Sequence, residues 1–513
     1  MTRTDNAIRN AKYVLLAQAL SLVFSFITRR FYVEFLSAEY LGLNGLFSNI
    51  LTVLSLAELG IGTSVTFSLY KPIAERDESK TAAFMRFFGR AYTVIGIVVL
   101  AVGLLLVPFL RFFVDDINAV LIAVPNFYLI YALYVIRSAC SYFFTYKRTL
   151  IIADQKKYVS SLVAICSSVA LFLAECTSIY FTRDYVLFMV LSIVIVLADN
   201  VAVSIVADRM YPFLRKNKKS ALDAEDKAVI KTNIEASFLH NIGGVIVNGT
   251  DNIIISRFVG FLKEGIYSNY HLICAAVDSL IRPVFQSITP SFGDLGVSGD
   301  DEHKTTVFHN IFFAGSWIYG FCSISIFILA EPFIRLWLGD GFELEPSAVL
   351  ILACNFYVTG MRRPGMLARE AMGLLRYDKW KSIIEAAINL VVSIALAKPL
   401  GVTGVLIGTF ASSLLTCFWI EPLVLYRHGL KSNVGKYFLR YGAYTAVSAI
   451  AFALSYCVCH AVRVAGIAGF CIKAVVCFTV PNVIYTLVYL KTNEMKSYIS
   501  LIKSKLFAKK EAK

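Results

Sequence analysis

Three charged residues stand close together in an apolar stretch of the chain: Arg29, Arg30 and Glu34. Guanidinium groups bind phosphate through directed hydrogen bonds, so arginines within a helix can hold an anionic group. Adjacent helical residues point about 100° apart, and we therefore expect only one arginine to face such a ligand. Glu34 is four residues after Arg30, a spacing that allows an ion pair. Alternatively, both arginines extend their charges into a membrane interface.

A single glutamate, Glu58, lies within another apolar run and is followed by Gly60 and Gly62. An acid in such a run is tolerated only where it is paired, protonated or wetted inside the protein. Glycines allow a neighbouring helix to approach closely, or the helix itself to bend. Three roles remain open for Glu58: an ion pair that holds helices together, a proton or cation site, and contact with a sugar.

The run at 233–256 is unusually rich in polar residues. Asn241, Asn248 and Asn252 are spaced by seven and four residues, which places them on one helical face. Asp251 lies near that face. Amides and carboxylates supply hydrogen-bond donors and acceptors in fixed directions, which suits a hydroxyl-rich sugar. The pattern predicts a helix that lines a polar cavity, with hydrogen bonding between helices as the alternative.

Further charges lie within other apolar runs. Asp278 and Arg282 are four residues apart and can form an ion pair, whereas Asp199 needs a cation from a neighbouring helix. Glu175, Glu385 and Glu421 lie nearer the ends of their runs and are expected at the membrane interface. The candidate substrate-binding residues are then Arg29, Arg30, Asn241, Asn248, Asn252 and Arg282, and the candidate ion-coupling residues are Glu58, Asp199, Asp251 and Asp278.

The elements that must position these residues are long apolar segments. Hydrophobic residues make up 58% of the 513 residues and charged residues 16%, whereas soluble domains have about 45–50% and about 25%. Each run is near the ~20 residues with which a helix crosses a bilayer. The sequence predicts an all-α polytopic membrane protein with about 14 transmembrane helices. The runs are 12–35, 43–68, 91–112, 118–138, 159–181, 185–207, 233–256, 265–287, 307–330, 346–364, 382–400, 402–424, 441–460 and 467–490, with a tight turn at 399–401.

The basic residues predict the orientation of the chain in the membrane. Most of the 49 Lys and Arg gather in clusters that fall on one predicted side, at 71–90, 147–157, 209–231, 362–381 and from 491 onward. The positive-inside rule places these clusters and both termini in the cytoplasm. Anionic lipid headgroups, rather than nucleic acid, account for the net charge of +14. The eleven cysteines include no CxxC motif, which favours packing over disulfides or a metal site.

The longest polar link suggests a division into domains. We predict an N-terminal lobe of helices 1 to 6 at 1–208, a cytoplasmic linker at 209–231, a C-terminal lobe of helices 7 to 12 at 232–427, and two extra helices with a basic cytoplasmic tail at 428–513. Arg30-Phe31 and Arg257-Phe258 begin weakly similar segments of the two lobes. A parallel repeat around a central cavity would follow.

Several patches carry a resemblance to a known family. Residues 38–49 (AEYLGLNGLFSN), 54–62 (LSLAELGIG) and 69–72 (LYKP) resemble the N-terminal signature of bacterial polysaccharide-unit flippases. These flippases belong to the multidrug/oligosaccharidyl-lipid/polysaccharide exporter superfamily. Residues 265–270 (GIYSNY) and 337–339 (WLG) are similar to further patches of the same family.

The resemblance implies a multi-pass transporter of the bacterial cytoplasmic (inner) membrane. It would flip undecaprenyl-pyrophosphate-linked oligosaccharide units by alternating access, for cell-surface polysaccharide biosynthesis. The resemblance also implies a cavity lined by the first, second, seventh and eighth helices, coupling to a Na⁺ or H⁺ gradient, and no cofactor. The expected partners are the lipid-linked oligosaccharide, membrane lipids and polysaccharide assembly proteins, with no nucleic acid; we expect a monomer. The arginines fit this function, because an anionic headgroup needs a wet, cationic path through hydrocarbon.

Two other functions remain open. A cation-coupled multidrug antiporter on the same fold would favour an acidic cavity, whereas Arg29, Arg30 and Arg282 are basic. A membrane-embedded glycosyltransferase or polymerase would present catalytic groups on large outer loops, and the longest predicted outer link is only 331–347. The sequence contains no HExxH, P-loop, GxSxG or metal-spaced Cys/His motif. We therefore expect a transporter and not an enzyme.

Overall fold

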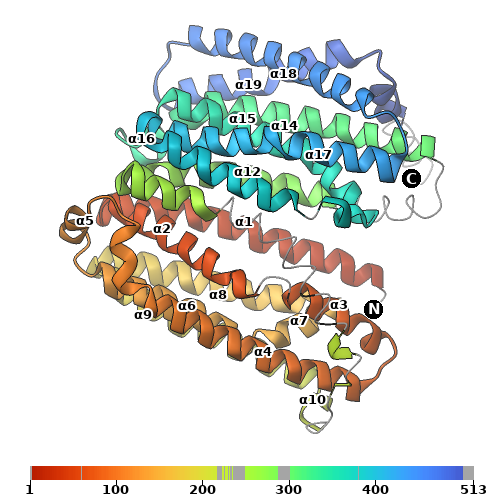
Figure 1. Ribbon diagram of the computed structural model, residues 1–513. Coiled ribbons are helices and arrows are strands. Elements are labelled where there is room, and N and C mark those ends of the chain that lie inside the picture. The colour runs from red at the N-terminus through yellow and green to blue at the C-terminus, as the bar shows by residue number, and fades with distance from the viewer. Residues whose placement is uncertain are drawn as a thin grey trace, which may run out of the picture. The chain divides into compact units, whose positions relative to one another are not determined.

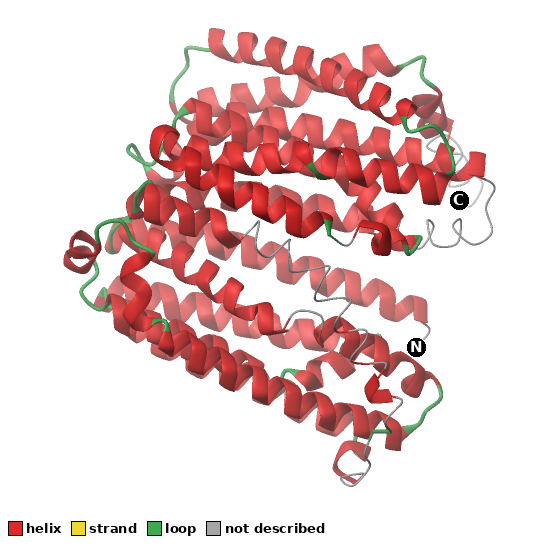
Figure 2. Cartoon of the chain, in the orientation of Figure 1, coloured by secondary structure: helices red, strands yellow, loops and turns green. Residues whose placement is uncertain are grey.

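A computed structural model (Figure 1) describes residues 3–58, 61–216, 222–223, 226–228, 230, 234, 249–286, 301–378 and 380–500. Within these ranges the secondary structure is helical throughout, with no strand (Figure 2). By length and composition, eight of the described helices can cross a membrane, or nine if one bent pair counts as a single span. The predicted all-α polytopic fold is confirmed for this part of the chain.

The chain forms two compact units, Met1–Ser268 and Asn269–Lys513, which we call the N-terminal and the C-terminal unit. In the N-terminal unit, α1 packs on α8, while α6 packs on both α4 and α9. The helices of this unit are α1 (Arg3–Phe35), α2 (Glu39–Leu54), α3 (Ile61–Ala74), α4 (Glu78–Leu105), α5 (Ile117–Ala123), α6 (Phe127–Tyr142), α7 (Tyr146–Ala153), α8 (Lys157–Thr177), α9 (Tyr185–Met210), α10 (Phe213–Lys216) and the helical residues 249–258.

The C-terminal unit is built around the long helix α14, which packs on α15, α18 and α19 (Figure 1). Its core is strongly aromatic: Phe312 stacks on Tyr437, and Phe313 packs edge-on against Tyr489. The helices are α12 (Phe261–Gln286), which begins in the N-terminal unit, α14 (Asp301–Leu338), α15 (Pro346–Ala371), α16 (Lys381–Leu415), α17 (Cys417–Val424), α18 (Gly435–Ala461) and α19 (Gly466–Tyr489).

The second predicted run, 43–68, is not a continuous helix. The α-helical part ends at Leu54, a 3₁₀ turn follows at Ser55–Glu58, and α3 begins at Ile61. A 3₁₀ turn within a run of helix often marks a hinge. The carboxylate that the sequence analysis singled out therefore lies where the helical path changes.

The fourth predicted run, 118–138, is also divided. Its two parts, α5 and α6, are bent by 83°, and Pro125 lies between them. Proline has no N–H to donate and disfavours helix for the residue before it. Asp116 begins α5 by accepting hydrogen bonds from the backbone N–H groups of Asn118 and Ala119, both at 3.1 Å.

The tight turn predicted at 399–401 is present as a sharp break within α16. Gly401 has φ 58°, a conformation that costs a residue with a Cβ atom. The two arms then pack closely, because a Cβ atom at Gly404 would overlap the backbone of Leu396. The runs 382–400 and 402–424 are thus a helical hairpin.

Two other long helices, α12 and α15, do not belong to the eight that can cross a membrane by length and composition. Each has 26 residues. They carry Asp278 and Arg282 on α12, and Arg362 and Arg363 on α15. Helices with such charges need polar partners inside the protein.

The predicted lobes and linker stay predictions. Much of the linker at 209–231 lies outside the described residues, as do the start of the seventh run and the end of the basic tail. The two predicted extra helices after 428 correspond to α18 and α19.

Candidate functional site

The C-terminal unit gathers charged side chains around Asp278. The predicted ion pair is present: Arg282 Nη2 lies 2.6 Å from Asp278 Oδ2. From α15, Arg363 Nη2 donates to both carboxylate oxygens, at 2.8 and 3.0 Å. The Tyr319 hydroxyl of α14 donates to Oδ1 at 3.3 Å. We call Asp278, Arg282 and Arg363 the arginine cluster.

A close contact between α14 and α15 positions this cluster. A Cβ atom at Gly360 would overlap the ring of Tyr319, so the missing side chain lets the phenol lie against α15. Gly360 and Arg363 are three residues apart and share a helical face. The same contact therefore brings the Tyr319 hydroxyl and the Arg363 guanidinium to one carboxylate.

The arginine cluster has two positive groups and one negative group, an excess of one positive charge. The side chain of Arg282 is 53% exposed, whereas those of Asp278 and Arg363 are 16% and 19% exposed. The Nε atom of Arg363 is buried and has no hydrogen-bond partner within the described ranges. Guanidinium groups with unused donors are well suited to phosphate. The cluster is therefore the candidate site for an anionic group.

Arg29 and Arg30 have different surroundings. Arg29 Nη1 donates to Ser268 Oγ at 2.8 Å, and its charge interacts with that of Glu264. Arg30 forms the predicted pair with Glu34, Nε to Oε2 at 3.3 Å, and its side chain is 49% exposed. Arg29 is thus partly buried in the N-terminal unit, whereas Arg30 lies at its surface.

Glu58 has tyrosine partners. The hydroxyls of Tyr92 on α4 and Tyr142 on α6 donate to its carboxylate. The two rings are stacked with centroids 6.5 Å apart, and both belong to the core of the N-terminal unit. These hydrogen bonds satisfy the carboxylate without an arginine, so the ion-pair role is the least supported of the three that we considered.

Asp199 on α9 has the cation that the sequence analysis required. Arg148 of α7 forms an ion pair with it, and Ser167 of α8 donates to Oδ1 at 2.7 Å. The preceding residue, Lys147, pairs with Asp208 of α9 at 2.7 Å. These pairs join α7 to α9 with matched charge.

Apart from residue 234, the polar run at 233–256 is described only from residue 249. Asp251 and Asn252 are each 8% exposed, so both are buried in the N-terminal unit. Asn241 and Asn248 lie outside the described residues. The predicted polar face of this run therefore stays a prediction.

A second group of buried charges was not found from the sequence. Glu421 of α17 is its centre: Arg362 Nη2, Arg369 Nη2 and Lys381 Nζ lie 2.9, 3.1 and 2.5 Å from Oε1. Glu385 accepts from Arg362 at 3.1 Å. With Asp378, which pairs with Arg369, the group has three cations and three anions.

This balanced network corrects one expectation. Glu385 and Glu421 were expected at the membrane interface, but they are only 8% and 3% exposed. Both acids lie near the ends of their predicted runs, but in the structure these helix ends pack against α15 and bury the side chains. A usable signal was the spacing of Arg362 and Arg369 by seven residues, which places two cations on one face of α15. Matched charge leaves no excess for a ligand, so we assign the network a structural role.

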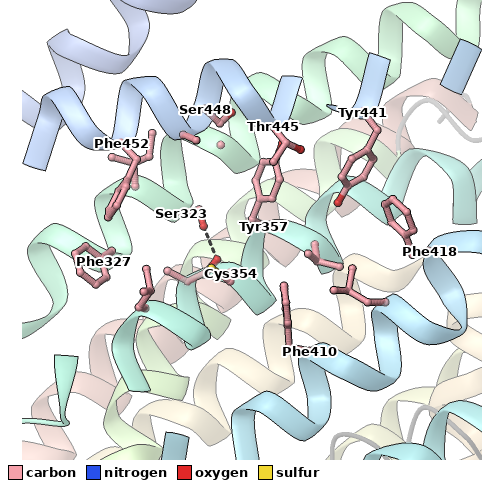
Figure 3. A pocket seen from close by; sticks show the side chains of 17 residues that line it. Ser323, Phe327, Cys354, Tyr357, Phe410, Phe418, Tyr441, Thr445, Ser448 and Phe452 are labelled. Atoms are coloured by element: carbon pink, nitrogen blue, oxygen red, sulfur yellow. Dashed lines mark hydrogen bonds between the residues drawn. The ribbon is translucent and has the colours of Figure 1, made fainter. Parts of the chain in front are cut away.

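An apolar cavity of about 380 Å³ lies within the C-terminal unit. Figure 3 shows aromatic side chains around it, among them Phe327, Tyr357, Phe410, Tyr441 and Phe452. No charged side chain lines it. It therefore cannot provide the charge that an anionic headgroup needs.

Metal ligation has little support in the part of the chain that the structure describes. No group of three or more His, Cys, Asp or Glu side chains there could hold a metal ion. All eleven cysteines are free thiols. The charged groups of interest are therefore the arginine cluster and the buried carboxylates.

Comparison by sequence gives no family: no protein-family model and no curated protein matches the chain. Solved structures do match. A structure of the lipid II flippase MurJ in an inward closed conformation is similar with a TM-score of 0.66 and 11% identity, over 94% of this chain and 99% of that one. An inward-facing multidrug resistance transporter of the MATE family gives 0.63 and 15%, over 81% and 95%.

A variant of the Vibrio cholerae MATE transporter VcmN gives a TM-score of 0.59 and 12% identity, over 84% of this chain and 99% of that one. The matches cover nearly the whole length of each solved structure. Identities this low establish the fold and leave the substrate open. The chain therefore shares the fold of these three solved structures.

Proposed function

We propose that the protein is a flippase for an undecaprenyl-pyrophosphate-linked oligosaccharide, working by alternating access in cell-surface polysaccharide biosynthesis. The observation that carries the proposal is the arginine cluster, with its positive excess, its half-exposed Arg282 and the unused Nε donor of Arg363. The fold likeness to a structure described as a lipid II flippase gives independent support.

The chemistry of the cluster suits a pyrophosphate. Each of the two guanidinium groups can bind two phosphate oxygens through parallel hydrogen bonds, whereas an ammonium group acts as a point charge. Asp278 serves as a resident counter-ion while the site is empty, because two unpaired arginines inside the protein would be costly. A pyrophosphate with about two negative charges then competes with Asp278 for the same donors.

The proposal also includes the oligomeric state, location, energy source and further substrate contacts expected from the sequence. The protein works as a monomer in the cytoplasmic membrane, with both termini in the cytoplasm, without a cofactor and driven by a Na⁺ or H⁺ gradient. Arg29, Arg30 and the asparagines near Asn252 contact the substrate at other stages of the cycle. Polysaccharide assembly proteins are the expected partners.

The test uses full-length protein in vesicles that contain a fluorescent undecaprenyl-pyrophosphate sugar. The rate at which the sugar becomes accessible to a membrane-impermeant glycosidase measures flipping. We expect Arg363→Gln to lower this rate about tenfold or more, because it removes charged hydrogen bonds of about 1.5–3 kcal/mol. The control is Arg335→Gln, which removes an exposed arginine that also pairs with two acids. An unchanged rate for Arg363→Gln would refute the proposal.

The rival function predicts the opposite effect. In a cation-coupled multidrug antiporter, such as the MATE transporters with a similar fold, Asp278 would be the binding group and Arg363 its competitor. Arg363→Gln would then increase uptake of a cationic dye, measured in the same vesicles. Dye transport that rises in this variant, together with no flipping, would favour the antiporter.

A further inference from the structure

Glu264 is a fully buried carboxylate that the sequence analysis did not single out. It lies in the first turns of α12, and its side chain is 0% exposed. Both carboxylate oxygens are buried, and neither has a hydrogen-bond partner in the described part of the chain. Among the acids discussed above, Glu58, Asp199 and Asp278 all accept hydrogen bonds.

The carboxylate fits its place because two residues of α2 have no side chain. A Cβ atom at Gly45 would overlap the carboxylate, and one at Gly42 would lie 3.3 Å from Oε2 and 2.5 Å from the carbonyl oxygen of Phe261. On the other helix, a Cβ atom at Gly265 would lie 2.8 Å from the backbone nitrogen of Gly42. The two helices therefore meet almost backbone to backbone around the acid, and the contact excludes water.

One cation acts on this carboxylate. The charge of Arg29, on α1, attracts it, while the Arg29 guanidinium donates a hydrogen bond to Ser268, one turn after Glu264 on α12. From α2, Gly42 and Gly45 face the acid. Among the described residues, the charge on Arg29 is the one that acts on the Glu264 carboxylate.

Burial of an ionised carboxylate that accepts no hydrogen bond costs several kcal/mol, even with a cation nearby. The protonated form is neutral and avoids most of that cost. Separation of α2 from the first turns of α12 would admit water, and water favours the ionised form. Closing the contact and binding a proton are therefore linked, since each favours the other.

We propose that Glu264 is a proton-binding site of this transporter, which takes up a proton as α2 closes on α12 and releases it when the helices part. Proton binding itself requires only the geometry above; its use to drive transport rests on the proposed function. The structure places α2 and the first turns of α12 in the N-terminal unit, whereas the predicted division assigns these helices to different lobes. Alternating access of those lobes would open and close this contact.

The first test needs no substrate. Infrared difference spectra of the full-length protein in lipid vesicles, recorded between alkaline and acidic pH, report the C=O band of protonated carboxyl groups. We expect a band that is present in the wild type, absent in Glu264→Gln and retained in Glu34→Gln, which alters an exposed acid. If Glu264→Gln leaves the wild-type spectrum unchanged, the inference is wrong.

Thermal stability gives a second readout. The buried acid favours protonation, so its contribution to stability is greatest at acidic pH and is lost as the pH rises. Glu264→Gln, which is neutral at every pH, should therefore melt higher than the wild type at alkaline pH, with the difference shrinking toward acidic pH. A difference that does not vary with pH would overturn the inference.

The flipping assay separates this inference from the proposed function. With an imposed proton gradient, Glu264→Gln should flip the sugar at a rate that no longer depends on the gradient. Full gradient dependence in this variant would refute the coupling role. If instead the wild type flips no sugar but its infrared band depends on Glu264, the proposed function fails and the proton site stands.

Discussion

The acids inside this chain differ in the groups that surround them, and those groups decide what each acid can do. Asp278 is held by two arginines, Glu58 by two tyrosine hydroxyls, and Glu264 by no hydrogen bond among the described residues. Arginines keep a carboxylate ionised, whereas neutral hydroxyls stabilise it without fixing its charge. Of these three acids, Glu264 thus has the fewest hydrogen-bonding groups to hold a negative charge.

At the scale of single residues, Glu58→Gln tests the coupling role predicted from the sequence. The amide keeps one oxygen for a tyrosine donor but brings two N–H groups that need acceptors. We expect the variant to insert and fold with its free energy of unfolding lowered by about 1 kcal/mol. The flipping rate is then measured with and without the ion gradient. A rate that no longer depends on the gradient supports coupling through Glu58. A rate that depends on the gradient as in the wild type shows that the residue only packs.

At the scale of elements, function depends on helices that touch without side chains between them. Gly42 and Gly45 of α2 meet α12 around Glu264, and Gly360 of α15 admits the ring of Tyr319 beside Asp278. Small residues allow such close packing inside membranes, where lipid provides no hydrophobic drive for helix association. Both candidate sites therefore depend on glycine contacts as much as on charged residues.

Gly45→Ala is the matching test of the α2–α12 contact. Its added methyl group would overlap the Glu264 carboxylate, and overpacking of this kind costs about 1–3 kcal/mol. The control, Gly442→Ala in α18, adds the same group where no atom lies within 4 Å. Thermal unfolding in detergent should show a clear loss for Gly45→Ala and no loss for the control; equal effects would argue against a tight contact.

Most apolar runs could be located from the sequence, because hydrophobicity is a local property, but the breaks within the runs 43–68 and 118–138 were not predicted. The turn at Gly401 and the pairing of Asp278 with Arg282 followed from neighbouring residues. Arg363 and Glu264 were missed because their partners lie far away in the sequence, at Asp278 and at the glycines of α2. Periodicity shows which face of a helix is polar, and it does not show which helix that face meets.

At the scale of the whole molecule, the distribution of basic residues predicts the orientation, with the links at Asp184 and Gly341 outside and those at Lys218 and Lys510 in the cytoplasm. Single cysteines at the first two positions should react with an impermeant thiol reagent in intact cells. Cysteines at the other two should react only after lysis. The native exposed thiols Cys166, Cys457 and Cys471 must first be replaced. Labelling at Lys218 from outside would contradict the predicted cytoplasmic linker.

The ion pair between α12 and α15 also has a consequence for how the protein is made. Ribosomes complete α12 before α15, so for a time Asp278 lacks its second arginine. A lone carboxylate enters the lipid phase poorly, and Arg282, one turn away on the same helix, is its only cation from the arginine cluster during that interval. The local pair thus carries α12 into the membrane, and the later arrival of Arg363 holds it there. The charges of Asp278, Arg282 and Arg363 would then serve both in membrane insertion of the nascent chain and in binding of the substrate.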